Sequence, residues 1–286
     1  MTGGPSSPAP GGYDVAVAFR VYPGVSKAPV RFADDKLRLA ETCLRSFATA
    51  VGGLRVKVWA LLDGCGPEYD GLFRSCFADE DLVVLRLERE GNQATFQRQI
   101  DILLGQDAAD LVYFAEDDYL YAPGSLAEMV SFIRAKPEAD FVSPYDHADY
   151  YQEKLHRHPV RVQAFGRRHW RTASSTCLTF LTRRETLRKA RRVFETYSTG
   201  NSDFSLWLSL TKLAGWNPLL PFLYRFTDRR YASPLLSVWR RTGLQMLFGP
   251  RFTLWVPIPS LATHMESTGL APVVEWEPVI DAVAPR

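Results

Sequence analysis

The feature that most constrains the fold is a regular alternation of strand-like and helix-like segments between residues 14 and 145. The strand-like segments cover 14–20, 54–64, 81–88, 111–114 and 139–145. Between them, apolar residues recur at helical spacing over 35–51, 69–77, 92–106 and 124–136. Alternation of this kind predicts an α/β fold with a mostly parallel central sheet flanked by helices. In such sheets, ligands bind just beyond the carboxyl ends of the strands.

The second half is less regular, but it contains no linker that would separate an independent domain. It shows β structure over 158–182 with a turn near Gly166, a basic helix over 183–197 and an amphipathic helix beginning near Asp203. We therefore expect one domain, residues 13–286, whose later elements extend the same sheet and cover the site. The Gly/Pro/Ser-rich residues 1–12 predict a disordered tail.

Charge and composition exclude several function classes. Net charge is +2, from 34 basic and 32 acidic residues, so the nucleic-acid binding expected of a strongly basic domain is not indicated. The four cysteines form no CxxC pair, and no apolar run reaches membrane-spanning length. These features predict a cytoplasmic protein. Residues 234–256 mix Arg with Trp, Leu and Phe, which indicates either peripheral contact with a membrane surface or core packing with paired arginines.

Three consecutive acids, Glu116, Asp117 and Asp118, follow the strand-like segment 111–114 almost directly. Three adjacent negative charges repel one another, so the arrangement needs an arginine, a helix N-terminus or a metal ion to stabilise it. Mg²⁺ and Mn²⁺ prefer carboxylate oxygens and keep positions open for water and substrate phosphates. The triplet therefore indicates a platform for a metal–diphosphate complex, and the alternative is a solvated acidic turn.

The segment "YFAEDDYLYAPGSLAEMV", residues 113–130, resembles the metal-binding segment of the GT-A type glycosyltransferases, nucleotide-sugar enzymes with a DxD motif. It is particularly similar to the EDD segment of N-acetylglucosaminyltransferase I. The order of an Asn-containing helix start at 90–106, a strand and an acidic cluster also resembles the large family-two group. Ala115 stands where many family-two members carry another Asp, which leaves Glu116 and Asp118 as the working pair of the motif. The resemblance covers residues 14–213, with a further match near His264.

The resemblance implies a role for each of several residues. Asp118 would bind the metal, Glu116 would lie near the donor ribose or sugar, and Asp117 would support the turn. Asp63 would contact the nucleotide base, or else form a simple turn. The remaining nucleotide-binding positions implied are Phe19, Arg20, Val21 and Arg98. Arg20 could instead be a surface cation, and Arg98 would pair with Asp117 or approach the donor.

Two later segments carry further resemblances. Asp203, followed by Leu206 and Trp207, is similar to the helix-start acid of inverting GT-A enzymes, where a carboxylate takes the proton of the acceptor hydroxyl. The alternative role for Asp203 is a helix cap. His264, in "PSLATHMES", is similar to a late histidine that closes over the metal or diphosphate. Small polar residues at 174–177 suit the lining of a sugar pocket.

A cluster of basic residues lies between 147 and 171 and includes the other four histidines, His147, His156, His158 and His169. Its spacing matches no zinc pattern. We expect either a surface segment or a basic loop that contacts phosphate or acceptor.

Together these signals predict a glycosyltransferase that uses Mn²⁺ or Mg²⁺ and a nucleotide-diphosphate sugar donor. The expected acceptor is a small molecule, a glycan or a lipid-linked compound, and nucleic acid is not expected to bind. In the implied division, residues 13–145 bind the nucleotide, and residues 146–286 bind the acceptor and close the site. One alternative is a nucleotidyltransferase of related fold, disfavoured because no GxGTR-like loop follows the first strand. Another is a non-catalytic module that binds a cation or a sugar.

Overall fold

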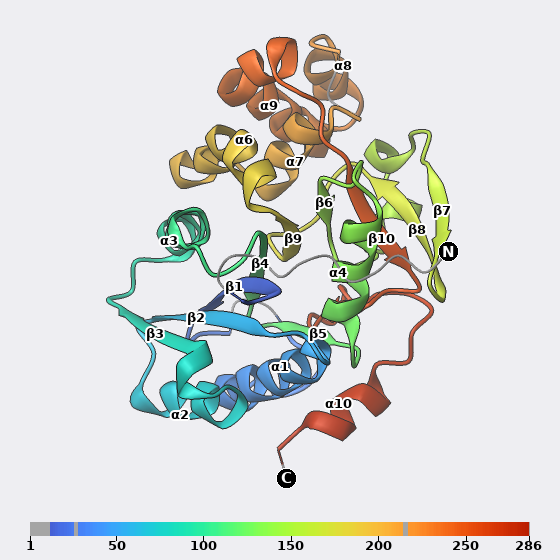
Figure 1. Cartoon of the computed structure of the whole chain (residues 1–286). Helices are drawn as coiled ribbons and strands as arrows, with labels where there is room; N and C mark the ends of the chain where they lie inside the picture. Colours follow the sequence, from blue (N-terminus) through green and yellow to red (C-terminus); the bar gives the residue numbers. More distant parts are fainter. Residues whose placement is uncertain (1–11, 26–27, 214–216, 286) are drawn as a thin grey trace.

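The computed structural model describes residues 12–25, 28–213 and 217–285 (Figure 1). The expected disordered tail, residues 1–12, lies almost entirely outside the described residues. No helix among the described residues is both long and apolar enough to cross a membrane.

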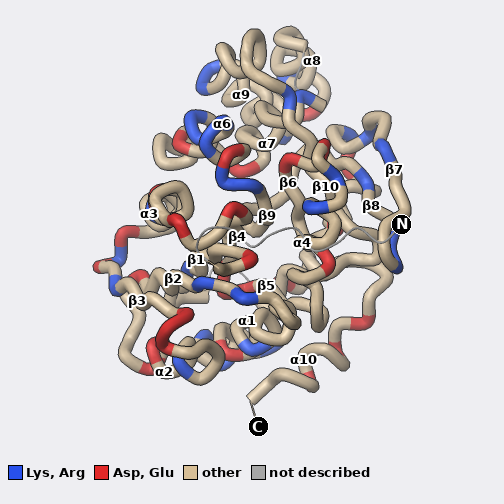
Figure 2. The backbone as a smooth tube through the Cα atoms, in the orientation of Figure 1, with Lys and Arg blue, Asp and Glu red and all other residues tan. Residues whose placement is uncertain are grey.

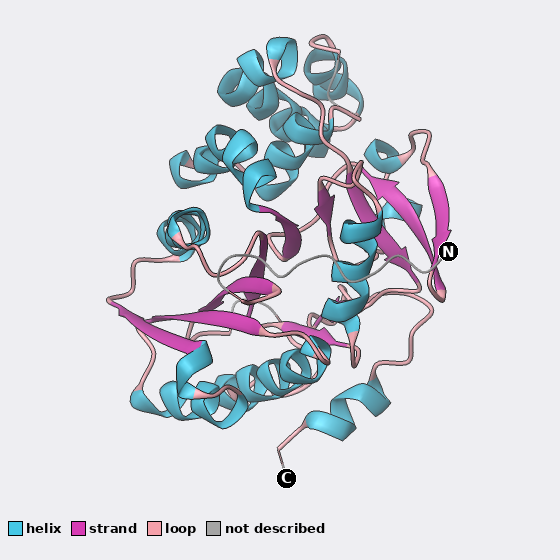
Figure 3. Ribbon diagram, in the orientation of Figure 1, coloured by secondary structure: helices cyan, strands magenta, loops and turns pink. Residues whose placement is uncertain are grey.

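A nine-stranded sheet in the order β3-β2-β1-β4-β9-β6-β10-β8-β7 forms the centre of the molecule (Figure 3). Its strands are β1 (Val15–Val21), β2 (Val56–Asp63), β3 (Leu82–Leu87), β4 (Leu111–Glu116), β6 (Phe141–Val142), β7 (Val162–Phe165), β8 (Arg168–Ala173), β9 (Phe180–Arg183) and β10 (Leu254–Ile258). The first four neighbours, β3, β2, β1 and β4, are all parallel. The α/β class and the parallel sheet predicted from the alternation are therefore confirmed.

The later strands extend this sheet, as the sequence predicted, but mainly in the antiparallel sense. β4 pairs antiparallel with β9, and β9 pairs antiparallel with β6. β6 is parallel to β10, which then pairs antiparallel with β8, and β8 with β7. β4 is thus the strand at which the direction of the sheet changes.

Helices cover both faces of the sheet (Figure 1). They are α1 (Lys36–Val51), α2 (Pro67–Cys76), α3 (Asn92–Gly105), α4 (Ser125–Ala135), α5 (Asp149–Gln152), α6 (Arg184–Phe194), α7 (Asp203–Thr211), α8 (Leu220–Thr227), α9 (Arg229–Phe248) and α10 (Glu277–Val283), with short 3₁₀ turns at Asp79–Asp81, Lys154–His156 and Glu195–Thr199.

Strand β1 shows how the two faces are filled. Side chains alternate across a strand, so Val17 and Phe19 enter the core on the side of α1 and α2, whereas Ala16 and Ala18 enter the core on the side of α3. All seven residues of β1 are buried, as expected for a central strand covered on both faces. The next residue on the α3 side is Arg20, which is therefore directed toward the carboxyl end of that face.

A separate two-stranded ribbon joins the end of β4 to a distant part of the chain. β5 (Tyr119–Tyr121) pairs antiparallel with β11 (Ala262–His264), and His264 lies opposite Tyr119 in the register. The backbone N–H of Met265 donates to the carbonyl of Asp118 at 2.8 Å. This short ribbon fixes His264 beside the acidic triplet.

Candidate active site

A cavity of about 370 Å³ lies at the carboxyl ends of β1, β2 and β4, where the sequence predicted a ligand site. We call it the strand-end cavity. Its lining comprises Arg20, Val21, Tyr22, Gly24, Lys36, Asp63, Gly91, Asn92, Thr95 and the acidic triplet, Glu116 to Asp118. The parallel register explains the convergence, because it places Arg20 directly beside Glu116.

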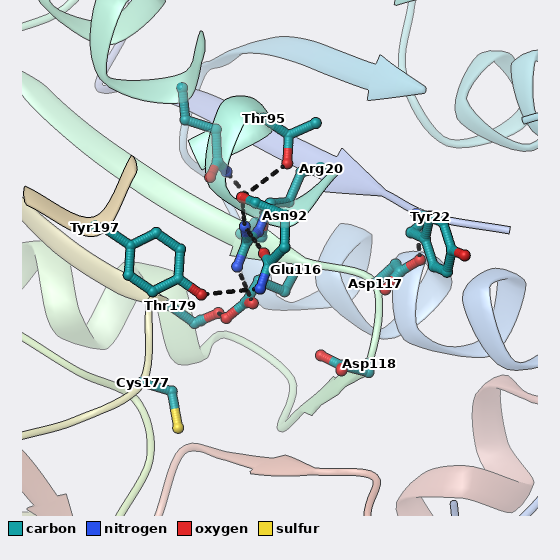
Figure 4. A network of polar contacts seen from close by, with 12 residues as sticks. Arg20, Tyr22, Asn92, Thr95, Glu116, Asp117, Asp118, Cys177, Thr179 and Tyr197 are labelled. Atoms are coloured by element: carbon teal, nitrogen blue, oxygen red, sulfur yellow. Dashed lines mark hydrogen bonds and ion pairs between the residues drawn. The ribbon is translucent and has the colours of Figure 1, made fainter. Parts of the chain in front are cut away.

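The Glu116 carboxylate is held by Arg20 and Thr179 (Figure 4). Arg20 Nη2 lies 2.5 Å from one carboxylate oxygen, and Thr179 Oγ1 donates to the other at 2.9 Å. Arg20 also donates to the backbone carbonyl and the side-chain oxygen of Asn92 at the start of α3. Asn92 Nδ2 in turn donates to the Tyr197 hydroxyl at 2.8 Å. Glu116 thus belongs to a connected polar network and not to a solvated turn.

Asp117 has a different partner, Lys36 on the first turn of α1. The Lys36 Nζ lies 2.9 Å from Asp117 Oδ2, which also accepts the backbone N–H of Tyr22 at 3.0 Å. Burial opposes protonation of Lys36, but the neighbouring Asp117 carboxylate outweighs it and raises the pKa of Lys36. Asp117 therefore ties the segment after β1 to α1.

Asp118 pairs with His264, whose Nε2 lies 3.1 Å from Asp118 Oδ2. The imidazole packs edge-on against Tyr119, and its Nδ1 lies 3.6 Å from Glu266. Burial opposes ionisation of Asp118, but His264, with Lys36 and Arg20, outweighs it and lowers the pKa of Asp118 to about 2. The second oxygen, Asp118 Oδ1, is buried and has no hydrogen-bond partner among the described residues.

The metal hypothesis can be tested against these ligands. Within the described residues, no group of three or more His, Cys, Asp or Glu side chains could hold a metal ion. Mg²⁺, however, is usually bound through only one or two carboxylates together with substrate phosphates and water. Asp118 offers a buried oxygen without a partner, with His264 beside it. These residues fit a divalent ion whose coordination is completed by a substrate.

Of the other residues implied for nucleotide binding, some line the strand-end cavity and others do not. Arg20 and Val21 line the strand-end cavity. Phe19 does not, because its ring is buried on the α1 and α2 side of the sheet, where it packs edge-on against Phe47 and Phe73. The structure thus places Phe19 in the core and not in a binding pocket.

Asp63 and Arg98 are placed differently: Asp63 lines the strand-end cavity, and Arg98 does not. Asp63 lines the cavity, but its two oxygens accept the backbone N–H groups of Glu90 and Gly91 at 2.6 and 2.8 Å, so it anchors the loop before α3. Arg98 is not part of the cavity lining and does not pair with Asp117. It lies on the exposed side of α3 and pairs with Glu90 at 3.1 Å. Lys36 occupies the place that Arg98 was expected to take.

A second cavity of about 370 Å³, here called the α7 cavity, contains Asp203. Its lining includes Tyr145, His147, Tyr150, Glu153, His156, Ser175, Thr176, Cys177, Arg230 and Tyr231. Two of the histidines and the small polar residues noted in the sequence thus face one space. Among the described residues these histidines form no metal-binding group with other ligands.

Asp203 is not the N-cap of α7. Ser202 has the extended backbone of an N-cap, and its Oγ accepts the N–H of Ser205 at 3.1 Å. Asp203 is the first helical residue, and its Oδ1 accepts the N–H of Phe204 at 2.7 Å. Ser202 is therefore the N-cap, and Asp203 supplies a second side-chain acceptor at the helix start.

Cys177 is influenced by the charges of both sites. It lines the α7 cavity, and Figure 4 shows it near Glu116 and Asp118. Burial raises the pKa of the Cys177 thiol, and the charges of Asp203, Glu116 and Asp118 raise it further. One side chain is therefore within electrostatic range of the acidic triplet and of Asp203.

Four residues of the strand-end network were not identified as functional from the sequence, namely Lys36, Thr179, Tyr197 and, beyond its place at a helix start, Asn92. The need for positive charge near the triplet was the one available signal for Lys36. Thr179 and Tyr197 belong to no motif, and only the sheet register and the position of the 3₁₀ turn after α6 bring them to Glu116.

Comparison with known proteins leaves the family open. No family model matches the chain, and no curated protein matches it. Among solved structures, CMP:2-keto-3-deoxy-manno-octonic acid synthetase in complex with CTP matches with a TM-score of 0.41 and 13% identity, over 70% of this chain and 87% of that one. Glucosyl-3-phosphoglycerate synthase from Mycobacterium tuberculosis, with Mn²⁺ and UDP, matches with a TM-score of 0.44 and 11% identity, over 70% and 66%. The glycosyltransferase GlyE of Streptococcus pneumoniae matches with a TM-score of 0.41 and 12% identity, over 94% and 63%. Similarities this low do not assign a function.

Proposed function

We propose that this chain is a glycosyltransferase that uses a nucleotide-diphosphate sugar, with the nucleotide in the strand-end cavity and the acceptor in the α7 cavity. Asp118 and His264 would hold Mn²⁺ or Mg²⁺. Asp203 would accept the proton of the acceptor hydroxyl, in a transfer that inverts the anomeric carbon.

The observation that carries this proposal is that the three carboxylates have different partners. Glu116 is paired with Arg20, and Asp117 is paired with Lys36. Asp118 alone of the three combines a histidine partner with a buried oxygen that lacks a hydrogen bond. Leaving a buried carboxylate oxygen without a partner costs free energy, so this atom is the best-prepared ligand for a cation in the strand-end cavity.

The remaining residues supply positioning and proton transfer. Arg20 and Lys36 hold Glu116 and Asp117 in place through ion pairs, which leaves Asp118 to face the ligand. When bound, the metal would offset negative charge on the departing diphosphate. As the acceptor oxygen forms its bond to the anomeric carbon and the bond to the diphosphate breaks, the hydroxyl proton becomes acidic and passes to Asp203. Cys177 lines the α7 cavity and is within electrostatic range of the acidic triplet, which supports this division between donor and acceptor.

Thermal unfolding in the presence of nucleotides tests the proposal. The midpoint is measured with UDP, GDP, dTDP, CDP and ADP, each with and without Mn²⁺ or Mg²⁺. A ligand that binds only the folded chain stabilises it by about 2.7 kcal/mol at a hundred times its Kd. We expect one nucleoside diphosphate to raise the midpoint, and to do so only with the metal.

The substitution Asp118→Asn should abolish this metal-dependent shift. Asp110→Asn is the matched control, because Asp110 precedes β4 at its opposite end and its side chain is 70% exposed. An unchanged shift in Asp118→Asn would remove Asp118 as the metal ligand. Stabilisation by Ca²⁺ alone, with none by nucleotides, would instead indicate the cation-binding module. Stronger metal-dependent stabilisation by a nucleoside triphosphate, with pyrophosphate release, would indicate the nucleotidyltransferase.

A further inference from the structure

Helices α8 and α9 lie at the end of the molecule opposite α1 and α2 (Figure 1) and expose large apolar side chains. On α8 and the residue before it these are Leu219, Phe222, Leu223 and Phe226, and each is more than half exposed. Their spacing, i, i+3, i+4 and i+7, places them along one stripe of the helix. Phe226 is 86% exposed, an unusual position for a phenylalanine with no partner to cover it.

This stripe is not the surface by which α8 packs on α9. Leu220 and Tyr224 make that contact, and the rings of Tyr224 and Tyr231 lie 5.5 Å apart. α9 is likewise divided, because it buries Leu235, Val238 and Met246 in the same cluster. Its opposite side exposes Leu236, Leu244, Leu247 and Phe248. We call the exposed apolar residues of both helices, with the arginines among them, the α8–α9 face.

Basic residues outnumber acidic ones in this segment (Figure 2). Residues 217–251 contain six arginines and one acid, Asp228, which gives the segment a net charge of +5 although the whole chain carries only +2. Arg230 pairs with Asp228. Within the described parts of the chain, Arg225, Arg229 and Arg240 form no ion pair.

We propose that the α8–α9 face docks on an anionic lipid bilayer. Exposed Leu and Phe side chains on helices that also carry arginines are the pattern by which amphipathic helices lie in a membrane interface. A surface of lipid headgroups is uniformly negative and attracts basic residues beside it. A surface that binds another protein would be expected to carry both acidic and basic residues around its apolar centre, whereas the α8–α9 face is mainly basic. The sequence alone left membrane contact and core packing as alternatives for 234–256, and the structure divides the segment between an inner packed side and an outer exposed side.

Docking would also bring the α7 cavity close to the membrane, because three residues at the start of α9 line this cavity. They are Arg230, Tyr231 and Pro234. The cavity would then lie beside the bilayer surface, which favours an acceptor that is itself lipid-linked. This last step rests on the proposed transferase function, whereas the docking itself does not.

Flotation of the full chain with vesicles tests the docking. We expect the protein to float with vesicles of phosphatidylcholine and phosphatidylglycerol, not with phosphatidylcholine alone, and to be released by high salt. Arg225→Gln with Arg240→Gln should weaken partitioning about fivefold for each arginine, since each contributes about 1 kcal/mol near an anionic surface. Phe226→Ser with Leu244→Ser should weaken it at least about tenfold through the loss of apolar burial.

Two exposed sites elsewhere provide controls. Arg188→Gln removes an exposed arginine from α6, and Val162→Ser removes an exposed apolar side chain from β7. Both variants should float as the unchanged chain does, and circular dichroism confirms that every variant is folded. Absence of flotation with anionic vesicles would overturn the proposal, as would equal flotation of the α8–α9 variants. A concentration-dependent dimer that Phe226→Ser disrupts, without vesicle binding, would assign the face to a second copy of the chain. Nucleotide binding is measured separately, so failure of the transferase proposal would leave the vesicle result unchanged.

Discussion

Glu116, Asp117 and Asp118 are consecutive, yet their side chains take partners from three different elements. Arg20 comes from β1, Lys36 from α1 and His264 from β11. Two of these partners remain cationic at neutral pH, whereas the third is a histidine, the side chain that changes charge most readily in that range. At the scale of single residues, the site therefore combines two fixed carboxylates with one that is available to a ligand.

Asp203 gives a prediction that separates catalysis from helix capping. Asp203→Asn should reduce sugar transfer about 10²- to 10⁴-fold, because the proton acceptor is lost. Its stability should change by no more than about 0.5 kcal/mol, since Ser202 caps α7. Ser202→Ala should show the reverse, a loss of about 1 kcal/mol with transfer retained. Sugar transfer is measured by release of the nucleoside diphosphate, and stability is measured by urea unfolding. Near-normal transfer by Asp203→Asn would exclude it as the base.

His156 gives a prediction about pH. Its Nδ1 lies 2.9 Å from Ser174 Oγ, and burial, with nearby cationic groups, lowers its pKa from 6.5 to about 4. Between these values the unfolded chain binds a proton that the folded chain excludes, so stability falls as pH falls through this window. Relative to the unchanged chain, His156→Asn should therefore gain about 2 kcal/mol between pH 7 and pH 5.

The measurement is urea unfolding of both chains at several pH values. Burial raises the pKa of Asp146 to about 6, which acts in the opposite direction, so only the difference between the two chains isolates His156. His169→Asn is the control, because His169 is exposed on β8 and an exposed imidazole keeps its solvation on unfolding. A difference between the chains that does not change with pH would show that His156 takes up a proton as readily in the folded chain as in the unfolded one.

At the scale of elements, α7 is joined to the sheet through Trp207. This side chain is fully buried among Phe141, Phe180 and Phe194, and its Nε1 donates to the carbonyl of Cys177 at 3.1 Å. One indole thus connects the helix that carries Asp203 with the loop that carries Cys177 and lines the α7 cavity.

Trp207→Phe should retain most of the packing but leave the Cys177 carbonyl without this donor. Trp255→Phe is a matched control, because Trp255 is equally buried and its Nε1 has no hydrogen-bond partner among the described residues. We expect Trp207→Phe to lose about 1–3 kcal/mol more than Trp255→Phe in urea unfolding. Equal losses would show that the hydrogen bond contributes nothing measurable.

The long elements were predictable and the short ones were not. β1, α1, β2 and α3 carry enough apolar residues at period 2 or 3.6 for the pattern to be read, and the parallel pairing follows from their alternation. β5 and β11 have three residues each, too few for any period to show. That ribbon was nevertheless decisive, because it brings His264 to Asp118.

Two residues implied for nucleotide binding, Phe19 and Arg98, lie outside the lining of the strand-end cavity. The sequence placed Phe19, Arg20 and Val21 together after the first strand. Arg20 and Val21 line the cavity, whereas the ring of Phe19 is buried in the core one residue earlier in the strand. Arg98 was assigned from its position on the helix before the triplet. Which side of a helix faces a site depends on how the helix packs, and α3 directs Arg98 toward solvent.

At the scale of the whole molecule, the two halves implied by the sequence are interleaved in one sheet. β6 belongs to residues 13–145, yet it lies between β9 and β10 of the second half. β9 in turn lies between β4 and β6. Neither half can therefore be removed without leaving strand edges of the other unpaired.

This interleaving predicts that the sheet unfolds as one unit. Far-ultraviolet circular dichroism and tryptophan fluorescence should give coincident urea transitions, since Trp59 reports on β2 and Trp170 and Trp255 report on β8 and β10. Two separated transitions would show that residues 13–145 and 146–286 are independent units.

The pairing of Asp118 with His264 also sets an order of events during translation. The ribosome has made Arg20 and Lys36 before it reaches the triplet, so Glu116 and Asp117 can find their partners early. His264 follows Asp118 by 146 residues, which at ordinary elongation speeds corresponds to about 7 to 30 seconds. During that interval the nascent chain holds two neutralised carboxylates and an Asp118 that still lacks its histidine. The site is complete only when the last-made strand joins the ribbon.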